Sequence, residues 1–194
     1  MRGSILTRIA PPVNSPVSLA DLKAHLRITS DDEDALIGAC LDAAVAVLDA
    51  QGWLGRGIIT QTWSESFPSQ TFAGLRLPLT LRQAVDLVAV DYRDADGVAQ
   101  SATLADFTLY DGAENPFVLS DAWPTVGVFP DALTVTYRVG FGENAADVPA
   151  PICQAIKLLA AHYFEIREPV VIGAVVSSVP LSVDALCNAY RVWF

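Results

Sequence analysis

The chain has 194 residues, of which 52% are hydrophobic and 18% are charged, and its formal net charge at pH 7 is −10. With 12 Lys and Arg against 22 Asp and Glu, it lacks the basic face that binds nucleic-acid phosphates. We also expect neither a membrane span, which needs roughly 20 consecutive apolar residues, nor a secretory signal.

The N-terminal third predicts an extended arm followed by two helices. Residues 1–16 form the arm, because the prolines between Ala10 and Pro16 disfavour helix. Ser18 is a good N-cap, and Leu19, Leu22 and Leu26 line one face of the first helix. A second helix starts after acids at 31–34 and stops at Gly52. Its apolar residues recur at helical spacing: Leu36, Ile37, Cys40, Leu41, Ala44, Val47 and Leu48.

Between residues 57 and 142 the hydrophobic period changes from helical spacing to alternation. About six short strands are predicted, separated by turn residues, with a hairpin at Asp96-Gly97. In the last strand, Leu133, Val135, Tyr137 and Val139 face one way. This pattern favours a small antiparallel sheet or barrel.

Helix returns after Pro149 and is predicted to run until Pro169. An apolar segment at 170–179 and Pro180 precede a short amphipathic helix, whose stripe is Val183, Leu186, Cys187 and Tyr190. The predicted fold class is therefore α+β: a helical core with two N-terminal helices, a long third helix and a short C-terminal helix, carrying an inserted β-sheet or barrel. The predicted divisions are 1–16 (arm), 17–56 and 143–169 (helical core), 57–142 (β insertion) and 170–194 (C-terminal segment).

No pattern in the chain predicts catalysis, a cofactor or a metal. His25 and His162 stand in no metal-binding or nucleophile motif. The acids at 31–34 could bind a hard cation, but they lack the alternating spacing and glycine of a calcium loop, which favours acids at a helix start. The three cysteines lie in apolar helical patterns and are predicted to be buried free thiols. We therefore expect a protein that is not an enzyme.

The order of these elements resembles the head–tail connector (adaptor, or head-completion) proteins of tailed phages, including relatives in prophages and gene transfer agents. The resemblance is carried by PVSLADLKAHLRI (16–28), DDEDALI (31–37), ITQTW (59–63), VTYRVGFG (135–142), VPAPICQAI (148–156), LLAAHYFEIRE (158–168) and VDAL (183–186). Together with the rest of the closing helix, these motifs span Pro16 to Tyr190. Residues 57–142 depart from the most compact relatives, which are nearly all helix.

The resemblance implies a structural adaptor ring, usually of twelve subunits, between the portal of the head and the tail. Its implied partners are further copies of the chain, the portal protein and a tail-side stopper or terminator protein, with no membrane. DNA would pass through the channel without specific binding. The implied location is the head–tail interface of a virion or phage-like particle, assembled in the bacterial cytoplasm. The alternatives are a capsid or tail accessory protein that forms no channel ring, and a small hydrolase.

Two sets of residues are predicted to carry this role. The resemblance assigns portal docking to the C-terminal segment, and its apolar residues are the expected interface: Leu181, Val183, Leu186, Tyr190, Trp193 and Phe194. A tail that folds back onto its own subunit is the alternative. An acidic channel wall would let DNA slide without sticking. Its candidates are Asp42, Asp49, Asp86, Asp91 and Asp94.

Overall fold

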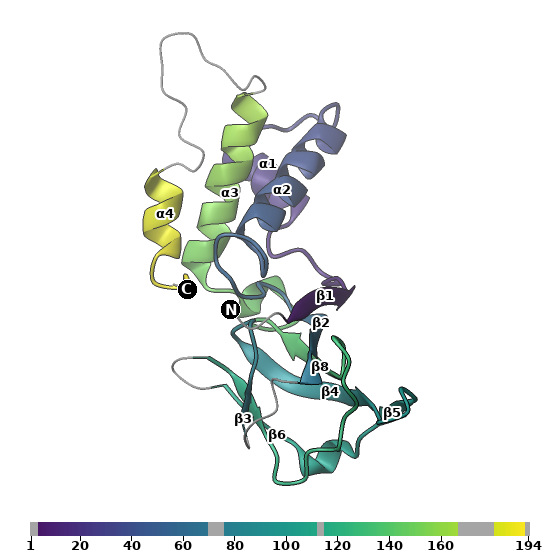
Figure 1. Ribbon diagram of the computed structural model, residues 1–194. Helices are drawn as coiled ribbons and strands as arrows, with labels where there is room; N and C mark the ends of the chain where they lie inside the picture. The colour runs from purple at the N-terminus through teal and green to yellow at the C-terminus, as the bar shows by residue number, and fades with distance from the viewer. Residues whose placement is uncertain (1–3, 70–75, 112–114, 167–180, 193–194) are drawn as a thin grey trace. The chain divides into compact units, whose positions relative to one another are not determined.

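The computed structural model describes residues 4–69, 76–111, 115–166 and 181–192, and it confirms the α+β fold class. The chain divides into two compact units (Figure 1). The sheet unit comprises Met1–Val13 and Thr60–Phe141, and the helical unit comprises Asn14–Ile59 and Gly142–Phe194. The first residues of the predicted arm thus group with the sheet. They form strand β1 (Ile5–Ala10), which pairs with β2 (Gln61–Phe67).

The two N-terminal helices of the helical unit are α1 (Leu19–Leu26) and α2 (Asp34–Leu48). Ser18 caps α1 as predicted, because its Oγ accepts a hydrogen bond from the backbone N–H of Asp21 at 3.0 Å. Helix α2 ends at Leu48, before the predicted stop at Gly52. Backbone N–H groups beyond the helix still bond its last turn, since Trp53 N donates to Val47 O at 2.7 Å. A Cβ at Gly52 would lie 2.1 Å from Val47 O, so this turn requires glycine.

Helix α3 (Ala150–Glu165) contacts α1, α2 and α4 (Leu181–Cys187). Its buried side chains recur every three or four residues, at Ile152, Ile156 and Leu159. From α2, the core receives Ile37, Cys40, Leu41, Ala44 and Leu48. Leu36 and Val47 share that helix but are exposed, at 37% and 38%. Helical spacing alone therefore overstated how much of α2 is buried within its own chain.

The sheet unit contains two open antiparallel sheets, so the barrel alternative is wrong for the described residues. The larger sheet has the strand order β1-β2-β8-β4-β5. Its remaining strands are β8 (Leu133–Val139), β4 (Ala84–Arg93) and β5 (Ala99–Ser101). The smaller sheet has the order β3-β7-β6 and is built from β3 (Arg76–Pro78), β7 (Phe117–Leu119) and β6 (Thr108–Tyr110).

The central strands of the larger sheet alternate as predicted. In β8, Leu133, Val135, Tyr137 and Val139 are all buried, whereas the residues between them are half-buried. Strand β2 lies opposite in register, with Trp63 beside Tyr137 and Glu65 beside Val135. The predicted turn at Asp96-Gly97 joins β4 to β5 and has Gly97 at φ 82°, a conformation that favours glycine. Strands β2 and β8 therefore each present one face to the core of the sheet unit.

Candidate docking and channel surfaces

The predicted portal-docking residues do not form one exposed stripe. Val183 and Cys187 are fully buried in the helical unit, where α4 packs against α3. Leu186 and Tyr190 are half-buried. The side chain of Leu181 and the residues Trp193 and Phe194 lie outside the described part of the structure. Among the described candidates, only Leu186 and Tyr190 therefore present side-chain surface to a partner.

The chain after α4 is held by residues that follow α2. The backbone N–H of Val192 donates to Leu54 O at 3.0 Å, and the Val192 side chain is buried. The guanidinium of Arg191 lies over the Trp53 ring, 3.9 Å from its centroid. Such a cation–π contact contributes about 0.5–1 kcal/mol at a partly exposed site. Residues 181–192 thus belong to the fold of their own subunit, whatever else they contact.

Three of the candidate channel acids lie on the sheet unit and have local partners. Asp86 on β4 pairs with Arg138 on β8, and Arg138 Nε donates to its Oδ1 at 2.7 Å. This hydrogen bond holds the pKa of Asp86 below its ordinary value. Asp91 accepts a hydrogen bond from Ser101 Oγ at 2.6 Å. Asp94 caps the β4–β5 turn, since its Oδ1 accepts from Val98 N at 2.9 Å.

The other two candidate acids lie on and after α2 and differ in exposure. Asp49 is only 7% exposed, and its Oδ1 accepts a hydrogen bond from the backbone N–H of Ile58 at 3.0 Å. This contact ties the end of α2 to the chain that follows. Asp42 is exposed on the helix surface. Of the two, only Asp42 presents its charge to solvent.

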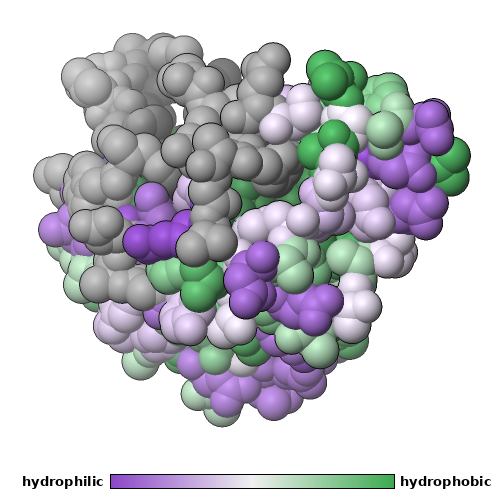
Figure 2. Space-filling model, turned by 60° about the horizontal axis from the view of Figure 1, so that its bottom comes forward, coloured by the Kyte–Doolittle hydropathy of each residue, from purple (hydrophilic) through white to green (hydrophobic). Residues whose placement is uncertain are grey.

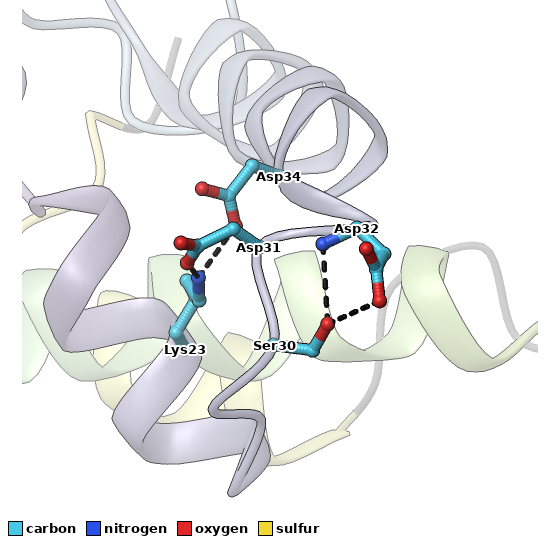
Figure 3. A network of polar contacts seen from close by, with 5 residues as sticks. All are labelled: Lys23, Ser30, Asp31, Asp32 and Asp34. Atoms are coloured by element: carbon cyan, nitrogen blue, oxygen red, sulfur yellow. Dashed lines mark hydrogen bonds and ion pairs between the residues drawn. The ribbon is translucent and has the colours of Figure 1, made fainter.

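The acidic run between α1 and α2 gathers around a lysine (Figure 3). Lys23 Nζ lies 2.5 Å from Asp31 Oδ1 and 2.6 Å from Asp34 Oδ1. The hydrogen bond from Lys23 holds the pKa of Asp31 below its usual value. Asp32 interacts instead with Ser30, whose Oγ also accepts from the Asp32 backbone N–H at 3.3 Å. Asp31 and Asp34 therefore hold the connection between α1 and α2 through the Lys23 side chain.

A buried polar cluster in the sheet unit was missed by the sequence analysis. Glu65 is 1% exposed, and its Oε1 accepts from Thr80 Oγ1 at 2.5 Å, while its Oε2 accepts from Thr80 N at 2.9 Å. The signal was available, because Glu65 stands between Trp63 and Phe67 at the inward positions of the alternation. A charged residue at such a position requires hydrogen-bond partners. Here it fixes the chain after β3 to the sheet.

Among the described residues on the face shown in Figure 2, hydrophobic residues lie in small groups between hydrophilic ones. Among the described helices, none has the length and apolarity to cross a bilayer. Within the described residues, no three His, Cys, Asp or Glu side chains are placed to hold a metal ion.

The chain is similar to known proteins of phage and phage-like particles. Residues 16–109 match the family model of the phage gp6-like head-tail connector protein. No curated protein matches the chain. The resemblance to phage head–tail connector proteins that the motifs predict is confirmed by this match.

Solved structures match the chain over nearly its whole length. A chain of the neck of an empty gene transfer agent (GTA) particle, computed with C6 symmetry, has a TM-score of 0.79 and 23% identity. Chains of the native GTA virion and of the native GTA neck, computed with C12 symmetry, each have a TM-score of 0.75 and 22% identity. Each match covers 98% of this chain and 96% of the other. The fold, including the long β insertion, is thus shared with proteins of the GTA neck.

Proposed function

We propose that the chain is a structural adaptor of the head–tail junction in a tailed phage or phage-like particle, forming a ring through which DNA passes. The observation that carries the proposal is the agreement of two matches. One is a connector family model over residues 16–109, and the other is a neck-protein fold over 98% of the chain. The proposed location is the head–tail interface, and the proposed role is structural, with no reaction to catalyse.

The symmetry of the similar structures and the charge of the chain support a ring with a channel. The similar neck structures were computed with C6 and C12 symmetry, which supports a ring of identical subunits. A subunit with net charge −10 suits a channel wall, because DNA phosphates find few cations to hold them. Asp42 is the best candidate of the acids, since its charge is exposed and Asp49 is buried. Asp86, Asp91 and Asp94 are weaker candidates because each is bound to a local partner.

The proposed portal contact is narrower than the C-terminal stripe read from the sequence. Leu186 and Tyr190 are half-buried, so they retain surface for a partner. Trp193 and Phe194 lie outside the described residues and stay candidates from the sequence alone. Val183 is buried against its own subunit and would support this surface from below. The opposite end of the assembly would receive a stopper or terminator protein of the tail.

Deletion of the gene for this chain alone tests the adaptor role. We expect filled or empty heads without attached tails, and restoration of tails when the chain is supplied in trans. A purified ring visible by negative stain, with a mass of about twelve subunits, would support the channel. The competing role is a capsid or tail accessory protein without a ring. Particles that keep joined heads and tails after the deletion would favour that role and remove the adaptor.

A further inference from the structure

The outward face of α2 is apolar along its length, although it is exposed within the subunit. The helix contains only two charged residues, Asp34 and Asp42, and both are acidic. Leu36 and Val47 are 37% and 38% exposed. Between them, on the same side of the helix, lie the exposed small residues Ala39, Ala43 and Ala46. We call these five residues the outer face of α2.

This composition is unusual for a helix surface that faces water. A surface helix normally has charged residues opposite its buried stripe, and a helix that is apolar all round is normally buried. The buried stripe of α2 already consists of Ile37, Cys40, Leu41, Ala44 and Leu48. The other long helix, α3, carries Gln154, Lys157 and Glu165. The outer face of α2 thus lacks the polar residues that solvent exposure favours.

From these observations we infer that the outer face of α2 is a contact surface for a second copy of this chain, in the ring put forward under the proposed function. Two observations favour a second copy as the occupant. The neck structures that share this fold were computed with C6 and C12 symmetry, in which each subunit has identical neighbours. Copies with net charge −10 repel one another, so a contact between them requires a region with few acids.

The geometry of the face fits close packing between helices. Alanines at 39, 43 and 46 leave room for a neighbouring helix to approach, and Leu36 and Val47 extend the apolar area toward both ends. Asp42 lies at the border of the exposed arc rather than at its centre. A charged residue at that position can stay in water at the rim of an interface. In a closed ring the contact is heterologous, so this face meets a different surface of the next subunit.

Sedimentation velocity tests the inference. It compares the wild-type full chain, over a range of concentrations, with a variant that carries a charge on the outer face of α2. Ala43→Glu places a carboxylate at the centre of the face, with little change in helix propensity. We expect its self-association to weaken by roughly 100-fold or more, because the contact would bury an unpaired charge. The matched control is Ala24→Glu, at an exposed alanine of α1, and we expect it to associate like the wild type.

Circular dichroism is measured first, to establish that each variant is folded. If Ala43→Glu is unfolded, Ala46→Glu provides the same charge one turn further along, and unfolding of both would place the face in the subunit core and overturn the inference. Equal association of the wild type and Ala43→Glu would also overturn it, as would a wild type that stays monomeric at every concentration. Attachment of tails to heads is scored separately. Its loss on deletion of the chain supports the adaptor role, whichever surface forms the ring.

Discussion

In the sheet unit, the hydroxyl of Tyr137 donates a hydrogen bond to Oε2 of the buried Glu65 at 3.0 Å. The same oxygen of Tyr137 accepts from the backbone N–H of Leu81 at 3.4 Å. Burial, and next the negative charge of Glu65, raises the pKa of Tyr137 far above its ordinary value. The hydroxyl is therefore protonated at neutral pH and can donate to Glu65.

Tyr137→Phe is expected to destabilise the chain, because it leaves a buried carboxylate and the Leu81 N–H each with one partner fewer. The expected loss is about 1–3 kcal/mol in the free energy of unfolding, measured by urea denaturation. Tyr110→Phe is the matched control. Tyr110 is 46% exposed and stacks on Phe117, so its ring contact survives removal of the hydroxyl. Equal stability of the two variants would show that the Glu65 cluster contributes nothing.

Asp86→Asn is expected to lower the free energy of unfolding at neutral pH and to leave it unchanged in strong acid. The hydrogen bond from Arg138 lowers the folded-state pKa of Asp86, so its contribution is fully present above the unfolded pKa of about 3.9. It is lost as the pH falls from there through the folded pKa. Both side chains are about 40% exposed, which limits the effect to less than about 1 kcal/mol.

The measurement for the Asp86 prediction is urea unfolding at pH 7 and near pH 2, in a double-mutant cycle with Arg138→Gln. In the Arg138→Gln background, Asp86→Asn should change stability equally at both pH values. A pH-dependent effect that persists without the arginine would assign the coupling to another group.

Val183→Ala is expected to destabilise the helical unit by about 2 kcal/mol, since it removes buried methyl groups and leaves a cavity. Deleting 181–194 should lower the free energy of unfolding further, because Cys187 and Val192 are also buried.

Deleting only Trp193 and Phe194 leaves this packing in place. Thermal melts, paired with assays of binding to portal-bearing heads, distinguish a role of this segment in folding from a role in portal binding. We expect the short deletion to keep the melting temperature and lose head binding. Full head binding by the short deletion would exclude those two aromatics as the anchor.

Asp42→Lys is expected to slow DNA ejection, because a cation on the channel wall would hold phosphates, and the delay should shrink as salt rises. Asp42→Asn, which removes charge without reversing it, should have a smaller effect. Ejection is timed in particles shown by imaging to have complete necks, because Asp42 borders the outer face of α2. Unchanged kinetics at low salt in both variants would remove Asp42 from the channel wall.

Local signals in the sequence predicted the start of α1, the β4–β5 hairpin and the buried side of β8, because each depends on residues close together in the chain. Ser18 predicted the start of α1, since an N-cap acts on backbone groups three residues away. Asp96-Gly97 predicted the hairpin, because its geometry requires a residue that tolerates positive φ. The alternation in β8 predicted which side chains are buried, because side chains on a strand point to opposite faces in turn. The ordered motifs also predicted the resemblance to head–tail connector proteins.

Only the tertiary structure decided which apolar and acidic residues are buried and which are exposed. Leu36 and Ile37 are neighbours in one helix, yet one is exposed and the other is buried, because α2 packs on one side only. Among the acids, Asp42 and Asp49 differ in the same way. The partners of the buried Glu65, Thr80 and Tyr137, come from other segments of the chain. The sequence likewise could not show whether the sheet closes into a barrel, because the alternation of a strand is the same in an open sheet and in a barrel. These features depend on which segments pack together, and local periodicity carries no information about a partner that is far away in sequence.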